Sequence, residues 1–507
     1  MVNQIARTFI LVGLVVAILL GLHFLPKLSV GDTDLRRVNI LSDVLPEVHE
    51  DDLGAMPVIP DVPAPQVTQA PQTSLLPPEG DTLLQATTET PSGIVGKAGA
   101  PEMVGETSTS EIIRTSADSV AAGATPILDY SQGRPGGMAR FYQQLARVGQ
   151  LGRPVRVAYY GDSFIEGDIF TADLRELLQD EFGGCGVGWV DCASQVNGFR
   201  TTVTHSYSGI REFEVVKRPF RQQNQGIAQR YFTAQNGASM TYKGTKVRRH
   251  LASWERAVFY LRTGSGVTLQ TLVNGDTTMV DHVEGSQNLQ AVVRSALDLQ
   301  SAGDSVQQRS SISSLSYTVS NIGSATLLYG VALEPATGVV VDNFSMRGSA
   351  GYTLSQIPAA TLAQFAAQRP YDLIVVHFGL NVANSKQGNY SGYIKQRGQA
   401  IDHLRQAYPQ AAILIVSMPD RDQRTDAGLR TMRGVEQLVA YQQLMASEHG
   451  VSFFNLFQAM GGRESMKNLV DRGLANKDYT HINFKGGRHL ARFLFDAMMA
   501  GYHSYGF

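Results

Sequence analysis

A serine, a histidine and an aspartate in two distant stretches of the 507-residue chain could together form a nucleophilic site. Ser163 ends the tripeptide Gly161-Asp-Ser, and Asp478 and His481 stand three residues apart near the C-terminus. A serine hydroxyl attacks well only when a base removes its proton, and the base needs a partner that fixes its tautomer. The short spacing lets one tight turn carry His481 as the base and Asp478 as the orienting carboxylate.

Two further stretches offer hydrogen-bond donors for the oxyanion that forms during acyl transfer. Gly351, in the sequence Arg-Gly-Ser-Ala-Gly-Tyr-Thr, has a backbone N–H that no Cβ shields. Asn381, in His-Phe-Gly-Leu-Asn, has a side-chain amide. The four stretches together predict attack of Ser163 on a carbonyl carbon.

The elements around Ser163 predict where the hydroxyl lies. Residues 155–161 form an apolar run typical of a buried strand, which Gly161 ends with a sharp turn. Leucines at helical spacing predict a helix over residues 171–182. Strand, turn and helix in this order place Ser163 at the carboxyl edge of an open α/β sheet.

The remaining chain on either side of a central region alternates between strands and helices. Helices are predicted over residues 138–147, 359–368, 393–408, 434–449 and 486–499, and strands over 371–378, 411–418 and 451–457. This alternation predicts a doubly wound parallel sheet in residues 127–195 and 336–507. Residues 196–335 instead contain short alternating strands separated by turn residues, which predicts an inserted all-β sandwich.

These motifs resemble those of the SGNH or GDSL hydrolases, which carry Ser, Gly, Asn and His in four ordered blocks. Ser163, Gly351, Asn381 and the Asp478–His481 pair match the blocks in that order. The resemblance implies a flavodoxin-like fold, a catalytic triad of Ser163, His481 and Asp478, and an oxyanion hole of the Ser163 N–H, the Gly351 N–H and Asn381. No organic cofactor or metal is expected.

The position of the insertion narrows this resemblance to the peptidoglycan O-acetylesterases of Gram-negative envelopes. In that group a carbohydrate-binding-like β-sandwich separates the Ser and Gly blocks, and residues 161–168 and 328–334 are also similar. The resemblance implies a serine esterase that removes O-acetyl groups from peptidoglycan through an acetyl-serine intermediate. An O-acetyltransferase acting on an exported polysaccharide and a non-enzymatic wall-binding protein remain alternatives.

The N-terminal region predicts attachment to a membrane. Residues 9–25 are apolar apart from His23 and follow Arg7, which favours a single-pass signal anchor within residues 1–29. Residues 30–126 are rich in Pro, Thr, Ser and acidic residues and predict a flexible, disordered linker. The catalytic part is therefore expected in the periplasm, anchored to the inner membrane.

Composition bounds the remaining possibilities. A net charge of −2 gives no reason to expect a nucleic-acid partner, and 43% apolar residues suffice for ordinary cores. Cys185 and Cys192 could form a short-loop disulfide or remain two buried thiols.

Several other residues have competing interpretations. His377 is interpreted as structural, Asp162 as a turn-stabilising side chain, and the Asp420–Asp422 pair as part of a solvated loop. The sequence does not assign Glu166 or Asp168. Three aromatic residues of the insertion could stack on sugar but are interpreted as core: Tyr231, Tyr242 and Trp254.

Overall fold

The computed structural model describes residues 29–30, 33–34, 124–299, 311–386 and 388–507. The predicted membrane anchor lies outside the described residues, and so does nearly all of the predicted linker, so both stay predictions. At the boundary between the two predicted ranges, β1 (Ser29–Val30) and β2 (Thr33–Asp34) form a short antiparallel pair. None of the helices in the described part of the chain combines the length and the apolar character that a membrane span requires.

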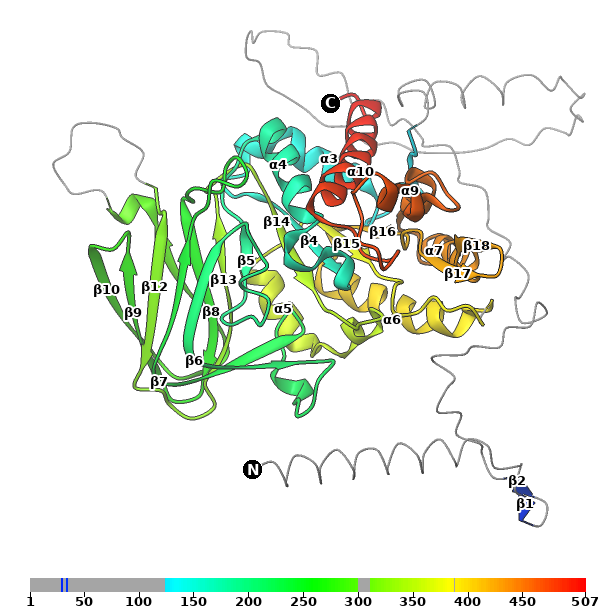
Figure 1. Cartoon of the computed structure of the whole chain (residues 1–507). Helices are drawn as coiled ribbons and strands as arrows, with labels where there is room; N and C mark the ends of the chain where they lie inside the picture. The colour runs from blue at the N-terminus through cyan, green and yellow to red at the C-terminus, as the bar shows by residue number, and fades with distance from the viewer. Residues whose placement is uncertain (1–28, 31–32, 35–123, 300–310, 387) are drawn as a thin grey trace, which may run out of the picture.

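The stretches that carry the predicted site residues belong to a six-stranded sheet covered by helices, which we call the α/β unit (Figure 1). Its strands lie in the order β14 (Val339–Ser345), β4 (Val155–Gly161), β15 (Leu373–His377), β16 (Ala412–Val416), β19 (Ser452–Phe454) and β3 (Ile127–Asp129). The central strands β4, β15 and β16 are buried along their whole length, because helices cover both faces of the sheet.

The helices form two groups on opposite faces of this sheet (Figure 1). On one face lie α3 (Met138–Ala146), α4 (Thr171–Phe182) and α10 (Phe484–Ser504). On the other lie α5 (Ala359–Gln368), α6 (Ser391–Ala407) and α7 (Val435–His449). The shorter helices α8 (Leu456–Ala459) and α9 (Ser465–Asp471) follow β19.

The prediction of a wholly parallel sheet is wrong at one edge. Strands β14, β4, β15, β16 and β19 are parallel, but β3 pairs with β19 in the antiparallel direction. The three residues of β3 precede the first helix, so no crossover connection obliges this strand to run parallel to its neighbour. The sheet is therefore mixed.

The insertion forms a nine-stranded antiparallel sheet, which we call the β unit. Its strands are β5 (Gly188–Val190), β6 (Thr204–Glu214), β7 (Arg230–Lys243), β8 (Arg256–Thr263), β9 (Val267–Val273), β10 (Thr277–Val283), β11 (Ser286–Ser295), β12 (Ser314–Ser320) and β13 (Leu327–Glu334). Strand β5 lies before the boundary expected at residue 196 and pairs with β13.

The predicted two-layer sandwich is wrong, because one continuous sheet curls nearly into a barrel (Figure 1). The 14-residue strand β7 pairs with β6 and with both β12 and β13, so hydrogen bonding continues through the curl. The end strands β10 and β11 are linked by the ion pair between Asp281 and Arg294. Alternating polarity shows which side chains point inward but does not tell whether strands form one layer or two.

Candidate active site

The turn at residues 161–163, which carries the predicted nucleophile Ser163 and which we call the nucleophile turn, leaves no room for a Cβ at Gly161. A Cβ on Gly161 would lie 2.8 Å from the Ile165 side chain and 2.9 Å from the carbonyl oxygen of His377. After this residue the chain turns into the 3₁₀ helix η3 (Ser163–Asp168), which starts with the half-buried Ser163. Asp162 caps η3, because its Oδ1 accepts a hydrogen bond from the Phe164 N–H at 3.0 Å.

The structure brings Ser163, His481 and Asp478 together in one hydrogen-bonded chain. The Ser163 Oγ lies 2.9 Å from His481 Nε2, and His481 Nδ1 lies 2.8 Å from Asp478 Oδ2. Asp478 Oδ1 also accepts the backbone N–H groups of Thr480 and His481, each at 3.0 Å. The turn therefore holds the carboxylate and the imidazole in one relative orientation.

The environment of Asp478 favours its ionised form. Partial burial alone would raise its pKa, but the hydrogen bonds from His481 and Thr480 outweigh burial and lower the pKa below its ordinary value. A carboxylate accepts the Nδ1 hydrogen of neutral histidine, which leaves the lone pair of Nε2 directed at the serine hydroxyl. This is the protonation state that a general base requires.

Two of the three predicted oxyanion donors, Gly351 and Asn381, both contact Ser349. The Asn381 Nδ2 donates to the Ser349 carbonyl oxygen at 3.0 Å, and the Gly351 N–H donates to Ser349 Oγ at 3.1 Å. An amide group has two hydrogens, so Asn381 keeps one that this contact does not use. The single N–H hydrogen of Gly351 is used by its bond to Ser349 Oγ.

Asp162 does more than the turn stabilisation that its position suggests. Its Oδ2 accepts the N–H groups of Gly379 and Leu380 at 3.1 and 3.2 Å, immediately before Asn381. Burial raises the pKa of this carboxyl group, although the three N–H groups it accepts act in the opposite direction. One buried side chain thus connects the nucleophile turn to the loop that carries Asn381.

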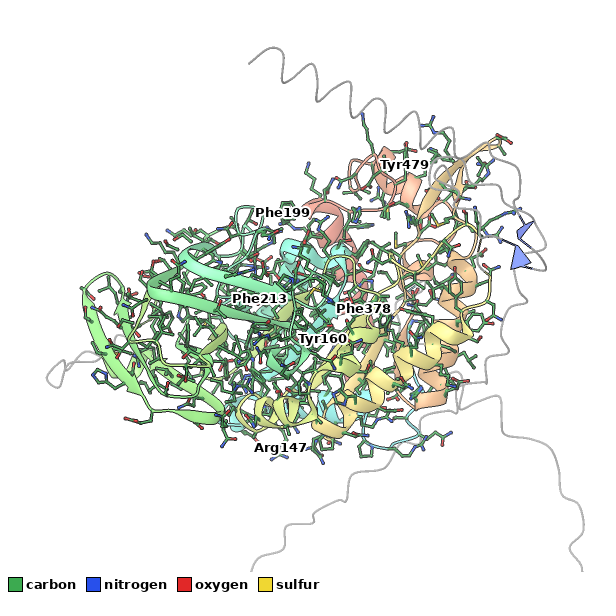
Figure 2. All side chains as sticks on the ribbon, turned by 90° about the horizontal axis from the view of Figure 1, so that it is seen from below. Arg147, Tyr160, Phe199, Phe213, Phe378 and Tyr479 are labelled. Carbon is green, nitrogen blue, oxygen red and sulfur yellow. The ribbon has the colours of Figure 1, made fainter. Side chains whose placement is uncertain are left out.

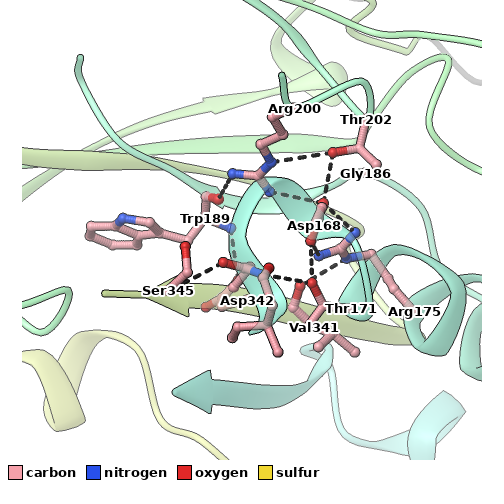
Figure 3. A network of polar contacts seen from close by, with 12 residues as sticks. Asp168, Thr171, Arg175, Gly186, Trp189, Arg200, Thr202, Val341, Asp342 and Ser345 are labelled. Carbon is pink, nitrogen blue, oxygen red and sulfur yellow. Dashed lines mark hydrogen bonds and ion pairs between the residues drawn. The ribbon is translucent and has the colours of Figure 1, made fainter. Parts of the chain in front are cut away.

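Asp168, which the sequence did not assign, is the centre of a buried network (Figure 3). Its carboxylate pairs with Arg175 of α4 at 2.9 Å and with Arg200 at 3.1 Å, and it accepts the Thr202 hydroxyl at 2.7 Å. Burial alone would raise its pKa, but the two guanidinium groups outweigh burial and lower it. The network attaches the end of η3 to the loop between β5 and β6 of the β unit.

Two arginines that sequence reasoning missed lie beside the predicted site residues. Exposed Arg347, on the Gly351 loop, forms an ion pair with Glu166 of η3. Arg421 donates to the Leu380 carbonyl oxygen at 3.2 Å, and its charge interacts with Asp478. The sequence signal for Arg347 was its position near the Gly351 block, and the signal for Arg421 was its position after the strand predicted over residues 411–418.

His377 is buried, as its structural interpretation expects. Its Nδ1 lies 3.0 Å from the Tyr159 hydroxyl, and its ring packs against Phe164 and Phe170. Burial, with a smaller effect of the Arg397 charge, lowers the pKa of His377 to about 3. The imidazole is therefore neutral at ordinary pH.

The solvated-loop interpretation of Asp420 and Asp422 is wrong, because both side chains are buried. They accept the N–H groups of Met466 and Lys467 in the first turn of α9, at 2.9 and 2.6 Å. Burial raises the pKa of Asp422 to about 6. Unpaired N–H groups at a helix start are good partners for carboxylates, which explains why this pair leaves solvent.

The remaining predicted features concern cysteines, aromatic residues and metals. Cys185 and Cys192 are free thiols, and burial raises the pKa of both. Tyr231, Tyr242 and Trp254 are buried in the core. Among the described residues, no group of three His, Cys, Asp or Glu side chains is arranged to hold a metal ion.

Comparison with known families bears on this site. The model of the GDSL-like lipase/acylhydrolase family matches residues 303–488. This chain carries a GDSL-like acylhydrolase domain. The chain is accordingly an esterase, and the matched region contains Gly351, Asn381, Asp478 and His481. Ser163 lies before the match, because the β unit separates it from the rest of the GDSL-like domain.

One solved structure supports the fold of this GDSL-like esterase, and a second match is too weak to bear on it. A structure described as a peptidoglycan O-acetylesterase in action aligns with a TM-score of 0.59 at 22% identity, covering 75% of this chain and 99% of that one. A family two carbohydrate esterase from Cellvibrio japonicus aligns at 9% identity over 60% of this chain and 99% of that one, with a TM-score of only 0.23. A sequence search of curated proteins found no match.

Proposed function

We propose that this esterase removes O-acetyl groups from a cell-wall glycan, with peptidoglycan as the substrate, through an acetyl-serine intermediate. The observation that carries the proposal is the chain of hydrogen bonds from Ser163 through His481 to Asp478. The nucleophile and its base come from residues 318 positions apart, so a local turn preference does not explain their contact.

In the first step, His481 Nε2 takes the proton of the Ser163 hydroxyl while Oγ attacks the acetyl carbonyl carbon. Asp478 stabilises the imidazolium that results and keeps Nδ1 protonated. The tetrahedral intermediate then breaks its bond to the sugar oxygen, which leaves with the proton held on Nε2. The acetyl group remains on Ser163.

The negative charge of the tetrahedral intermediate requires donors that are already in place. We assign this role to the Ser163 N–H, the Gly351 N–H and the Asn381 amide. Asp162 supports the assignment, because it holds the Asn381 loop against the nucleophile turn. For Gly351 to act as an oxyanion donor, its N–H must release the Ser349 hydroxyl oxygen and donate instead to the acetyl oxygen of the substrate.

In the second step, His481 removes a proton from water, which attacks the acetyl-serine carbonyl. Acetic acid leaves when Ser163 Oγ takes the proton back from Nε2. The products are a glycan with a free hydroxyl group and acetic acid, which ionises to acetate and a proton.

The proposed location follows from the N-terminal sequence. The apolar segment at residues 9–25 would anchor the chain in the inner membrane, and the acidic, proline-rich linker would let the catalytic part reach the wall in the periplasm. The structural neighbour described as a peptidoglycan O-acetylesterase supports the choice of peptidoglycan as the substrate.

The test is acetate release from O-acetylated peptidoglycan by the detergent-solubilised full chain. Wild-type protein should release acetate, and Ser163→Ala should lose at least about 10³-fold of that activity because it lacks the nucleophile. Ser504→Ala, at the exposed end of α10, is the matched control and should match wild type. Cleavage of a small acetyl ester without release from the wall would contradict the glycan substrate. Equal activity of Ser163→Ala and wild type would contradict the mechanism.

A further inference from the structure

Phe199 is an exposed aromatic residue that contacts the segments following both Ser163 and His481. It retains 46% of its accessible surface, and it lies at the molecular edge next to the start of α10 (Figure 2). A Cβ on Gly167 of η3 would lie 2.4 Å from its ring, and its ring centroid is 5.4 Å from that of Phe484. Gly167 lies four residues after Ser163, and Phe484 lies three residues after His481.

The loop that carries Phe199 is held in place on both sides. The Arg200 guanidinium pairs with Asp168 and also donates to the Trp189 carbonyl oxygen at 3.1 Å. The Asn197 amide donates to the carbonyl oxygen of His205 at 2.9 Å. The exposed ring is thus positioned in advance, so a ligand that binds it does not have to order the loop.

The surroundings of Phe199 favour a sugar over an acyl chain. A small cavity of about 40 Å³ beneath the same loop is lined mainly by polar side chains, including Glu166, Asn197, Arg200 and Asn343. That volume accommodates a few water molecules but not a sugar ring. A flat apolar ring next to hydrogen-bonding groups matches a pyranose, which has apolar C–H faces and hydroxyl groups at its edge.

We propose that Phe199 is the platform on which a sugar ring of the substrate stacks, so that the β-unit loop selects glycan esters for Ser163. This inference rests on the proposed function and deepens it. Exposed Tyr352, next to Gly351, is a second aromatic side chain beside a catalytic block. The β unit then acts in substrate choice through one loop at the active site rather than through a distant binding surface.

The experiment compares kcat/KM for O-acetylated peptidoglycan fragments with kcat/KM for ethyl acetate, which has no ring to stack. Phe199→Leu keeps an apolar side chain but removes the flat ring, and Phe199→Tyr and Phe199→Trp keep an aromatic ring. Phe507→Leu is the control, because Phe507 has a similar exposure of 42% and lies beyond the opposite end of α10. That helix has 21 residues, so the two sites are separated by about 30 Å.

We expect Phe199→Leu to lower the preference for the glycan over ethyl acetate about ten-fold, mainly through KM for the glycan. Phe199→Tyr and Phe199→Trp should restore most of the preference, and Phe507→Leu should leave it unchanged. If Phe199→Leu lowers both activities equally, or if the aromatic variants behave like leucine, the inference is wrong while the proposed function stands. If the wild-type protein releases no acetate from the fragments, the proposed function fails and Phe199 loses its assigned ligand.

Discussion

Replacing Glu334 with glutamine should destabilise the protein strongly, because this buried carboxylate forms ion pairs between the two units. Glu334 ends β13 of the β unit and is completely buried. It pairs with Arg156 of β4 at 2.8 Å and with Arg369, at the end of α5, at 2.7 Å. Arg369 also pairs with Asp342 of β14, at 2.8 Å.

The size of the effect can be worked from these contacts. Glutamine keeps the shape of the side chain but leaves two buried guanidinium groups with Asp342 as the remaining carboxylate of the network. Removing one partner from a buried ion pair costs about 3–5 kcal/mol. The pKa gives a similar figure. Burial alone would raise the pKa of Glu334, but Arg369 and Arg156 lower it from 4.5 to about 2, which corresponds to roughly 3 kcal/mol.

The same shift predicts a pH dependence with a definite sign. The pKa of Glu334 is lower in the folded state than in the unfolded state. The contribution of its ionised form to the free energy of unfolding is therefore complete above pH 4.5 and is lost as the pH falls towards 2. The difference in stability between wild type and Glu334→Gln should therefore be constant at neutral pH and should shrink below pH 4.5.

Urea unfolding followed by tryptophan fluorescence measures this difference. The two tryptophans of the chain, Trp189 and Trp254, are both buried, and Trp189 lies on β5 next to β13. Glu436→Gln is the matched control, because it removes one carboxylate from an exposed pair with Arg463 and should cost less than about 1 kcal/mol. If Glu334→Gln costs no more than this control, the network does not hold the units together and the reasoning is refuted.

Two further predictions concern positioning at the active site. Asp478→Asn should lower kcat on a small acetyl ester about 10⁴-fold with little change in KM, because the amide no longer favours the Nδ1–H tautomer of His481. A loss of kcat below ten-fold would contradict the role of Asp478 in orienting His481. Asp162→Ala should lower kcat about 10²-fold, because the N–H groups of Gly379 and Leu380 lose their acceptor and the Asn381 loop shifts. Asp162→Asn keeps a carbonyl acceptor and should recover part of the lost kcat. Equal kcat values for the two variants would argue against a positioning role of Asp162.

The sequence predicts the α/β unit well because each of its signals is local. The apolar run before Gly161 and the leucine spacing in residues 171–182 each specify an element without reference to the rest of the chain. The carboxyl ends of parallel strands meet at one edge of the sheet. Predicted site residues that follow different strands are therefore expected to lie close together at that edge. The contact of Ser163 with His481 follows from this topology.

The features that the sequence did not predict depend on distant partners. Neither the spacing nor the residue type shows that Asp168 binds Arg200, or that Asp420 turns inward to the start of α9. The contact of Phe199 with Gly167 likewise needs the loop before β6 to fold back over η3. The curl of the β unit depends on which strands pair with β7, and alternation of polarity is the same in an open layer and in a closed one.

The chain leaves the α/β unit and returns to it at almost the same point. The Val339 N–H donates to the Gly183 carbonyl oxygen at 2.8 Å, so the end of α4 and the start of β14 already touch. A segment whose two ends are adjacent can be exchanged for another without moving the elements that flank it. A graft between residues 183 and 339 would need to replace several contacts, among them the Glu334 carboxylate that pairs with Arg156 and Arg369, the loop that reaches Asp168, and the packing of Trp189 against Phe344.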